Sequence, residues 1–94
     1  MKVIFTVEAL ADLDGILAYV ATNHPTLSTA LDRQIRTVLG RISAWPESAR
    51  EVLDRRGVRV VALMRYPYRI FYSVTNDGVV ILHLYHSSRR VPRA

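Results

Sequence analysis

Hydrophobic and polar positions follow two different periods along the chain, and the change of period divides it into a helical part and a strand part. In the first half, apolar residues recur every three to four positions, as they do on one face of an amphipathic helix. From Val58 onward the apolar runs are short and rich in β-branched and aromatic residues, and turn-forming residues separate them, as is typical of strands. The pattern predicts an α+β fold.

Two amphipathic helices are predicted after a short β-prone run over residues 2–6. Thr6 is a suitable N-cap for the first helix, and Glu8 then faces the positive end of the helix dipole. Pro25 disfavours helical geometry in the residue before it, so this helix is expected to stop near Asn23. Its buried stripe consists of Leu10, Leu13, Leu17 and Val20, with Ile16 beside them.

The second predicted helix follows closely and ends at the sequence "WPE". Its buried stripe consists of Leu27, Leu31, Ile35, Val38, Ile42 and Trp45. Two helices joined by so short a connection form an antiparallel hairpin.

Three strands are predicted over residues 58–64, 68–74 and 79–86, with "RYP" and "TNDG" as the turns between them. The order of elements is therefore β-α-α-β-β-β, with the helical hairpin packed on one face of a small antiparallel sheet. A chain of 94 residues has room for one core, so residues 1–94 are expected to form a single domain.

Strand parity assigns side chains to the two faces of this sheet. In the middle strand, burial of Ile70, Tyr72 and Val74 against the helices sends Arg69 and Phe71 to the face without helices. The neighbouring strand is expected to add Arg59, Val61 and Leu63 to that face, or the residues that alternate with them.

The last strand leaves its parity open, because both of its alternating sets are apolar enough to be core. One set is Val80, Leu82 and Leu84, and the other is Val79, Ile81, His83 and Tyr85. If the first set points inward, strict alternation places His83 on the face of Arg69. A bulge near the strand end would leave His86 free to turn either way.

Composition and residue spacing argue against disulfides, metal sites, membrane spans and a signal peptide. The chain has no cysteine, which excludes disulfides and thiolate metal sites. His83 and His86 point to opposite sides of a strand, so a metal site is not expected. No stretch approaches the ~20 apolar residues of a membrane span, and the first residues lack the pattern of a signal peptide. A cytoplasmic location without membrane partners is expected.

The net charge of +5 is distributed unevenly. Residues 1–54 hold five basic and seven acidic residues, a balance of −2, whereas residues 55–94 hold eight arginines and one aspartate, a balance of +7. Arg89, Arg90 and Arg93 concentrate positive charge beyond the last strand. This asymmetry suits an anionic partner, either a nucleic acid or an acidic protein segment.

The candidate chemistry is limited to acid–base cleavage of RNA. The chain has no Gly-rich phosphate loop and no nucleophile-elbow serine, so no cofactor is expected. Cleavage of RNA needs a base, a cation and an acid. Glu47 or Glu51, Arg69 and His86 are the candidates for these roles in that order, although their spacing does not require it.

Several motifs occur in an order that resembles the RelE/ParE toxin superfamily: "ADLDGILAYV", "HP", "ISAWPE", "YPYRIFYSV", "DGVVILHLYH" and "SSRR". The resemblance covers nearly the whole chain. It implies a small basic toxin of a bacterial type II toxin–antitoxin module, of the kind that stabilises plasmids, with two helices against an antiparallel sheet.

The two branches of this superfamily imply different targets. RelE-like members cleave mRNA on the ribosome, and by that resemblance Arg69 matches the phosphate-handling arginine and His86 the C-terminal histidine. The lysine cluster of several RelE-like enzymes is missing, since Lys2 is the only lysine. The motifs "WPE", "YPYRIFY" and "HSSR" look more like the ParE branch, whose members inhibit DNA gyrase and are not known as ribonucleases. A folded relative that binds but is no longer toxic is the third alternative.

Either branch implies a cognate antitoxin and a toxin–antitoxin hetero-oligomer. A flexible acidic segment of the antitoxin would fold onto the apolar and basic surface, over the sheet or around the helical hairpin. The residues expected to meet the target or the antitoxin are Arg59, Arg69, Phe71, Tyr85, Arg89, Arg90 and Arg93.

Overall fold

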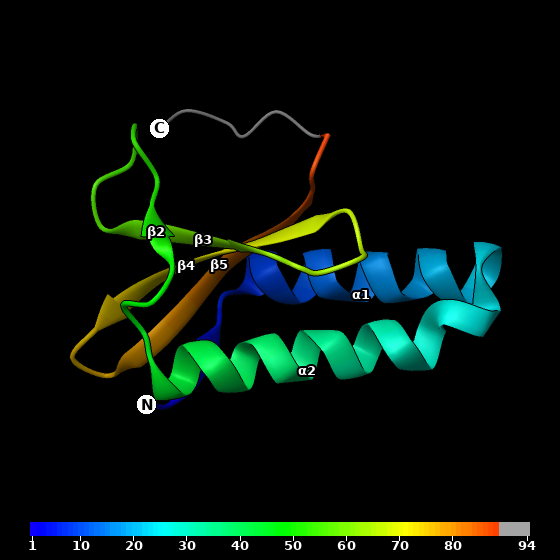
Figure 1. Ribbon diagram of the computed structural model, residues 1–94, viewed down its shortest axis with the longest axis horizontal. Coiled ribbons are helices and arrows are strands. Elements are labelled where there is room, and N and C mark those ends of the chain that lie inside the picture. Colours follow the sequence, from blue (N-terminus) through cyan, green and yellow to red (C-terminus); the bar gives the residue numbers. More distant parts are fainter. Residues whose placement is uncertain (89–94) are drawn as a thin grey trace.

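The computed structural model describes residues 1–88 and shows two helices packed on a five-stranded mixed sheet (Figure 1). The elements in chain order are β1 (Val3–Phe5), α1 (Val7–Asn23), the 3-10 turn η1 (Pro25–Leu27), α2 (Ser28–Ala44), β2 (Arg50–Glu51), β3 (Val58–Ala62), β4 (Tyr68–Thr75) and β5 (Gly78–His86). The predicted α+β class and the order of the main elements are confirmed. Neither helix in this part of the chain combines the length and apolar composition needed to cross a membrane.

The helical hairpin forms where the sequence predicts it. The Thr6 hydroxyl oxygen accepts a hydrogen bond from the Ala9 amide at 3.0 Å and so caps the start of α1. Helix α1 ends at Asn23, and η1 turns the chain into α2. The two helices run side by side, and their connection extends past the end of the sheet (Figure 1). The hairpin is therefore longer than the sheet face that it covers.

The sheet has the strand order β1-β5-β4-β3-β2. Strands β2, β3, β4 and β5 pair antiparallel with one another in that order, as expected for the strand-rich half of the chain. The first strand departs from the expected antiparallel sheet, because β1 pairs with β5 in parallel. Strand β2 adds two residues at the opposite edge, where the sequence pattern predicts no strand.

The main core lies between the helices and the sheet. Ile70 and Tyr72 of β4 are fully buried in it, and Val74 packs against it, so the predicted parity of this strand is confirmed. The helices contribute Ala9, Val20, Leu31, Ile35, Val38 and Ile42. Three side chains of the predicted stripes, Leu10, Leu27 and Trp45, are instead exposed.

A second apolar cluster fills the face that the helices do not cover. Val58, Val60, Phe71 and Tyr85 are buried together there, with Val52 and Leu82 packed against them. Phe71 and Tyr85 were expected to meet a partner, but their rings are not displayed on this face, since only 2% of Phe71 and 5% of Tyr85 is exposed. The chain fills this face itself because the valines of β3 and the segment after β2 close over the two rings.

A β-bulge in β5 explains why its parity is ambiguous in the sequence. Phe71 pairs with His83 while Tyr72 pairs with Ile81, so Leu82 is the extra residue. The bulge shifts the phase of alternation. Ile81 before it and Leu84 after it both face the main core, whereas Leu82 and Tyr85 pack in the second cluster. Neither alternation suggested by the sequence holds along the whole strand.

Candidate partner-binding surfaces

Arg69 lies on the face without helices, as predicted, but it is held in place by its surroundings. It pairs with Ala62 on one side and Tyr85 on the other. Its guanidinium donates to the Ser87 carbonyl oxygen at 3.1 Å, and its Cζ atom lies 5.8 Å from the centroid of the Phe71 ring. Arg69 thus covers the edge of the second apolar cluster while part of it remains accessible.

Arg59 does not share this face. Its neighbours Val58 and Val60 occupy the second cluster, so parity turns Arg59 toward the helices. There its guanidinium donates to the carbonyl oxygens of Glu47 at 3.2 Å and Ala49 at 2.6 Å. Of the two sets that the sequence leaves open for β3, the alternate set shares the face of Arg69. The expected place of Arg59 on that face is therefore wrong, and Arg59 fixes the connection between α2 and β2.

The two histidines of β5 lie on different sides of the sheet. His83 stacks on Tyr85 with ring centroids 4.8 Å apart, so His83 and not His86 shares the face of Arg69. The His86 ring meets Tyr68 edge-on at 5.5 Å, and its Nδ1 atom lies 2.7 Å from the Ser88 hydroxyl. This places His86 away from the arginine.

The candidate acid, base and cation for RNA cleavage are not brought together. Glu51 lies on β2, three strands from His86, and its side chain accepts the Gly57 amide at 2.8 Å. Glu51 is level with Tyr72 of β4, whereas His86 is level with Tyr68. These offsets separate the backbone of Glu51 from the backbone of His86 by roughly 14 Å across the sheet and ~13 Å along it. The tail arginines Arg89, Arg90 and Arg93 lie outside the described residues.

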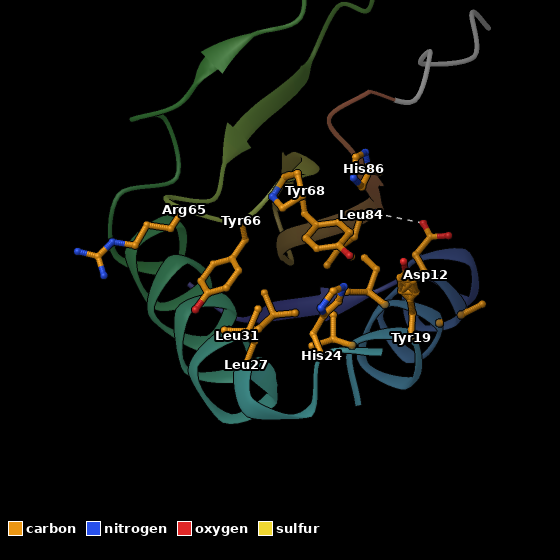
Figure 2. A pocket seen from close by; sticks show the side chains of 15 residues that line it. Asp12, Tyr19, His24, Leu27, Leu31, Arg65, Tyr66, Tyr68, Leu84 and His86 are labelled. Atoms are coloured by element: carbon orange, nitrogen blue, oxygen red, sulfur yellow. Dashed lines mark hydrogen bonds between the residues drawn. The ribbon is translucent and has the colours of Figure 1, made fainter. Parts of the chain in front are cut away.

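A groove opens where the helical hairpin extends past the sheet, and we call it the distal groove. It has a volume of about 940 Å³ and lies between the far half of the hairpin, the β3–β4 turn and the end of β5 (Figure 2). Its rings come from Tyr19, His24, Tyr66, Tyr68 and His86. Ala11 and Gly15 of α1 line it, and the space beside Gly15 is open, because no atoms lie within 4 Å of the position a Cβ of Gly15 would take.

The groove is largely apolar in its chemistry. Burial raises the pKa of the Tyr68 hydroxyl, and the nearby Tyr19 adds to this effect. The Asp12 carboxylate accepts the Leu84 amide at 3.1 Å and lies 3.3 Å from Nδ1 of His83, so it is engaged at the outer edge of β5. The volume of the distal groove is at the upper end of the range for ligand pockets, which suits several apolar side chains of a peptide.

Residues 1–88 contain no group of three or more acidic or histidine side chains able to hold a metal ion.

Sequence reasoning missed this groove, although part of the signal was present. Tyr66 and Tyr68 belong to the aromatic motif "YPYRIFY", but the motif does not reveal that their rings face the hairpin. His24 reads as a simple turn residue before Pro25, and Tyr19 lies off the predicted buried stripe. An exposed aromatic residue on an amphipathic helix is the observation that would have indicated a partner.

Tyr72 connects the core to the segment after α2 and sets an alkaline limit to stability. Its hydroxyl donates to the Pro46 carbonyl oxygen at 2.6 Å. Burial raises the pKa of this hydroxyl above its ordinary value of 10.0, and a main-chain bond with Ala49 and the charge of Arg59 offset part of the rise. Because the pKa is higher in the folded state, the unfolded state loses its proton first as the pH rises.

We therefore expect the free energy of unfolding to be retained up to about pH 10 and to fall above it. Urea titrations at about pH 8 and about pH 11 measure this loss. Tyr72→Phe should lower stability by about 1 kcal/mol at the lower pH, because the bond to Pro46 is lost, and should show a smaller fall at the higher pH. Equal alkaline losses in the two proteins would contradict the assignment to Tyr72.

Comparison with known proteins identifies a family for this fold. Residues 3–91 match the family model described as "ParE toxin of type II toxin-antitoxin system, parDE". No curated protein sequence matches the chain at a significant level. Among solved structures, a chain of the chromosomal ParDE toxin–antitoxin system from P. aeruginosa superposes with a TM-score of 0.77 at 23% identity, covering 92% of this chain and 95% of the other. The isolated E. coli RelE toxin superposes with a TM-score of 0.60 at 16% identity, covering 94% of this chain and 85% of the other.

Proposed function

Since the chain belongs to the ParE toxin family of type II toxin–antitoxin systems, we propose that it inhibits DNA gyrase in the cytoplasm and that a cognate antitoxin neutralises it. The match over residues 3–91 supports the ParE branch of the superfamily. Gyrase as the target follows from the family resemblance of the motifs. A small basic protein with an apolar groove is consistent with a function that depends on binding other proteins.

One structural observation favours gyrase over mRNA as the target. The groups that would cleave RNA are Arg69, His86 and either Glu51 or Glu47. Arg69, His86 and Glu51 lie on three different strands, and Glu47 lies before β2, beside the β4–β5 turn. His86 faces the distal groove while Arg69 covers the opposite face of the sheet. Acid–base cleavage needs the base, the acid and the cation within hydrogen-bond reach of one phosphodiester. This arrangement does not provide such a site.

The distal groove is the best candidate for the antitoxin. The face without helices is filled by the second apolar cluster, so an antitoxin segment gains little apolar contact there. The groove instead offers the rings of Tyr19, Tyr66 and Tyr68 in a cavity of about 940 Å³. A disordered antitoxin segment that folds into this groove would bury these rings and gain their hydrophobic free energy.

The proposed function is tested by adding the purified protein to a gyrase supercoiling assay and, in parallel, to a translating ribosome whose mRNA is mapped for cuts. We expect loss of supercoiling and intact mRNA. The co-encoded antitoxin should restore supercoiling with the wild-type toxin, and more antitoxin should be needed with Tyr19→Ala, whose ring is half exposed in the groove. Cut mRNA with normal supercoiling would support the ribonuclease alternative, and no effect in either assay would support a binding module.

A further inference from the structure

Trp45 is the only tryptophan of the chain, and it lies on the surface directly after α2. The side chain is 67% exposed. A tryptophan ring can bury about 150–250 Å² and is a large source of stability when it does so. Trp45 therefore contributes little of this to the fold, and its hydrophobic area remains for a contact outside the chain.

The backbone around Trp45 is fixed from beneath. Its own amide donates to the Arg41 carbonyl oxygen at 2.8 Å, and its carbonyl oxygen accepts the Ser48 amide at 3.1 Å. The Tyr72 hydroxyl and the Arg59 guanidinium hold the following residues through their main-chain carbonyl oxygens. A large ring on a backbone that is already ordered loses little conformational entropy when it binds.

The surface beside Trp45 is hollowed, and we call it the Trp45 surface. A groove of about 740 Å³ lies between residues 44–48 and the β4–β5 turn, and Met1, Trp45, Pro46, Glu47 and Val74 contribute to its lining. Among residues 1–88, no lysine or arginine side chain lines it, and Glu47 is its charged side chain. The main-chain amine of Met1 donates to the Ser43 carbonyl oxygen at 2.7 Å. Nucleic acids bind through several cations that contact phosphates, and the one ammonium group in this lining, that of Met1, is already bound to Ser43. This chemistry therefore fits a protein surface and not a nucleic acid.

The Trp45 surface and the distal groove lie at opposite ends of the molecule. Leu27 and Leu31, at the start of α2, line the distal groove, whereas Trp45 follows the end of α2 (Figure 1). The 17 residues of this helix place the two surfaces roughly 26 Å apart. A protein bound at one surface leaves the other accessible.

We propose that the Trp45 surface is the contact between the toxin and its protein target, with the indole ring inserted into an apolar pocket of that target. This inference rests on the proposed function and takes gyrase as the target. The pocket must also supply a hydrogen-bond acceptor, because a buried indole N–H usually finds a partner. Inhibition and neutralisation then use separate surfaces of one small protein.

Trp45→Ala, Trp45→Phe and Leu10→Ala test the proposal. Leu10 is a matched control because it is an exposed apolar residue that lines neither groove. In the supercoiling assay, we expect Trp45→Ala to need roughly tenfold more protein or more, as for truncation of an interface anchor. Trp45→Phe should be intermediate and Leu10→Ala unchanged. All three variants should keep the wild-type circular dichroism spectrum and affinity for the antitoxin.

A second measurement does not depend on any substitution. Protein labelled with 5-fluorotryptophan carries a single fluorine, at Trp45, and its ¹⁹F resonance reports directly on this side chain. We expect added gyrase to change the chemical shift of this resonance and the antitoxin to leave the chemical shift unchanged.

Each contrary outcome identifies what has failed. If the wild-type protein inhibits gyrase and Trp45→Ala inhibits it equally well, the proposed contact is wrong and the proposed function stands. If the wild-type protein leaves gyrase active, both fail. Loss of antitoxin affinity in Trp45→Ala would assign the surface to the antitoxin. A change in molar mass by light scattering would assign it to a second copy of the chain, and either result overturns the proposal.

Discussion

Gly78→Ala should destabilise the protein by about 3 kcal/mol or more, a large part of the 5–15 kcal/mol that is typical of a small domain. Gly78 begins β5 with a φ of +147°, a conformation that residues with a side chain rarely adopt. A Cβ atom at this position would lie 2.3 Å from the Lys2 carbonyl oxygen and 3.1 Å from its carbonyl carbon. The Lys2 oxygen also accepts the Val79 amide at 2.8 Å, so it cannot move away without breaking the pairing of β1 with β5.

Urea unfolding followed by circular dichroism measures this loss. Gly40→Ala is the matched control, because Gly40 lies on the exposed side of α2 and no atoms surround the position of its Cβ. Alanine has the higher helix propensity, so this control should be more stable than the wild type by up to about 1 kcal/mol. A Gly78→Ala protein as stable as the wild type would show that β1 can shift without cost.

Phe71→Ala should cost about 3–5 kcal/mol, the usual range for removal of a buried phenylalanine ring. The ring is 2% exposed and packs against Val58, Val60 and Tyr85. Its removal leaves a cavity on the face of the sheet opposite the helical hairpin. The same urea experiment measures the loss.

Two comparisons distinguish a packing role of Phe71 from a binding role. Phe71→Leu keeps most of the apolar volume and should recover much of the lost stability. Leu53→Ala changes a side chain that is 97% exposed and should leave stability within about 0.5 kcal/mol of the wild type. If Phe71→Ala unfolds like the wild type and only toxicity is lost, the ring is a contact residue and the second cluster is not a core.

The parts of the fold that the sequence predicts are those with local causes. Thr6 caps α1 through its own hydroxyl, and Pro25 ends the helix through its effect on the preceding residue. The parity of β4 follows from the alternation of Ile70, Tyr72 and Val74 with more polar neighbours.

The remaining parts depend on contacts between distant segments. Nothing near Leu82 marks a bulge, because both alternations of β5 are apolar. The parallel pairing of β1 with β5 joins residues more than 70 positions apart. The second apolar cluster was missed because the sequence leaves open whether Val58 and Val60 or their neighbours share the face of Phe71. The distal groove arises because the hairpin is longer than the sheet. The hydrophobic periodicity of the sequence does not indicate this difference in length.

The position of β1 beside β5 affects when the protein can become harmful during synthesis. Val3 pairs with Val79 and Phe5 with Ile81, so the first strand has no neighbour until the last strand exists. Contacts so distant in sequence form late, because a long loop must close before they are gained. If translation stops before the codons of β5, the resulting fragment lacks this strand, and its helices have no completed sheet to pack on. Premature products of this gene are therefore expected to be harmless to the cell that makes them.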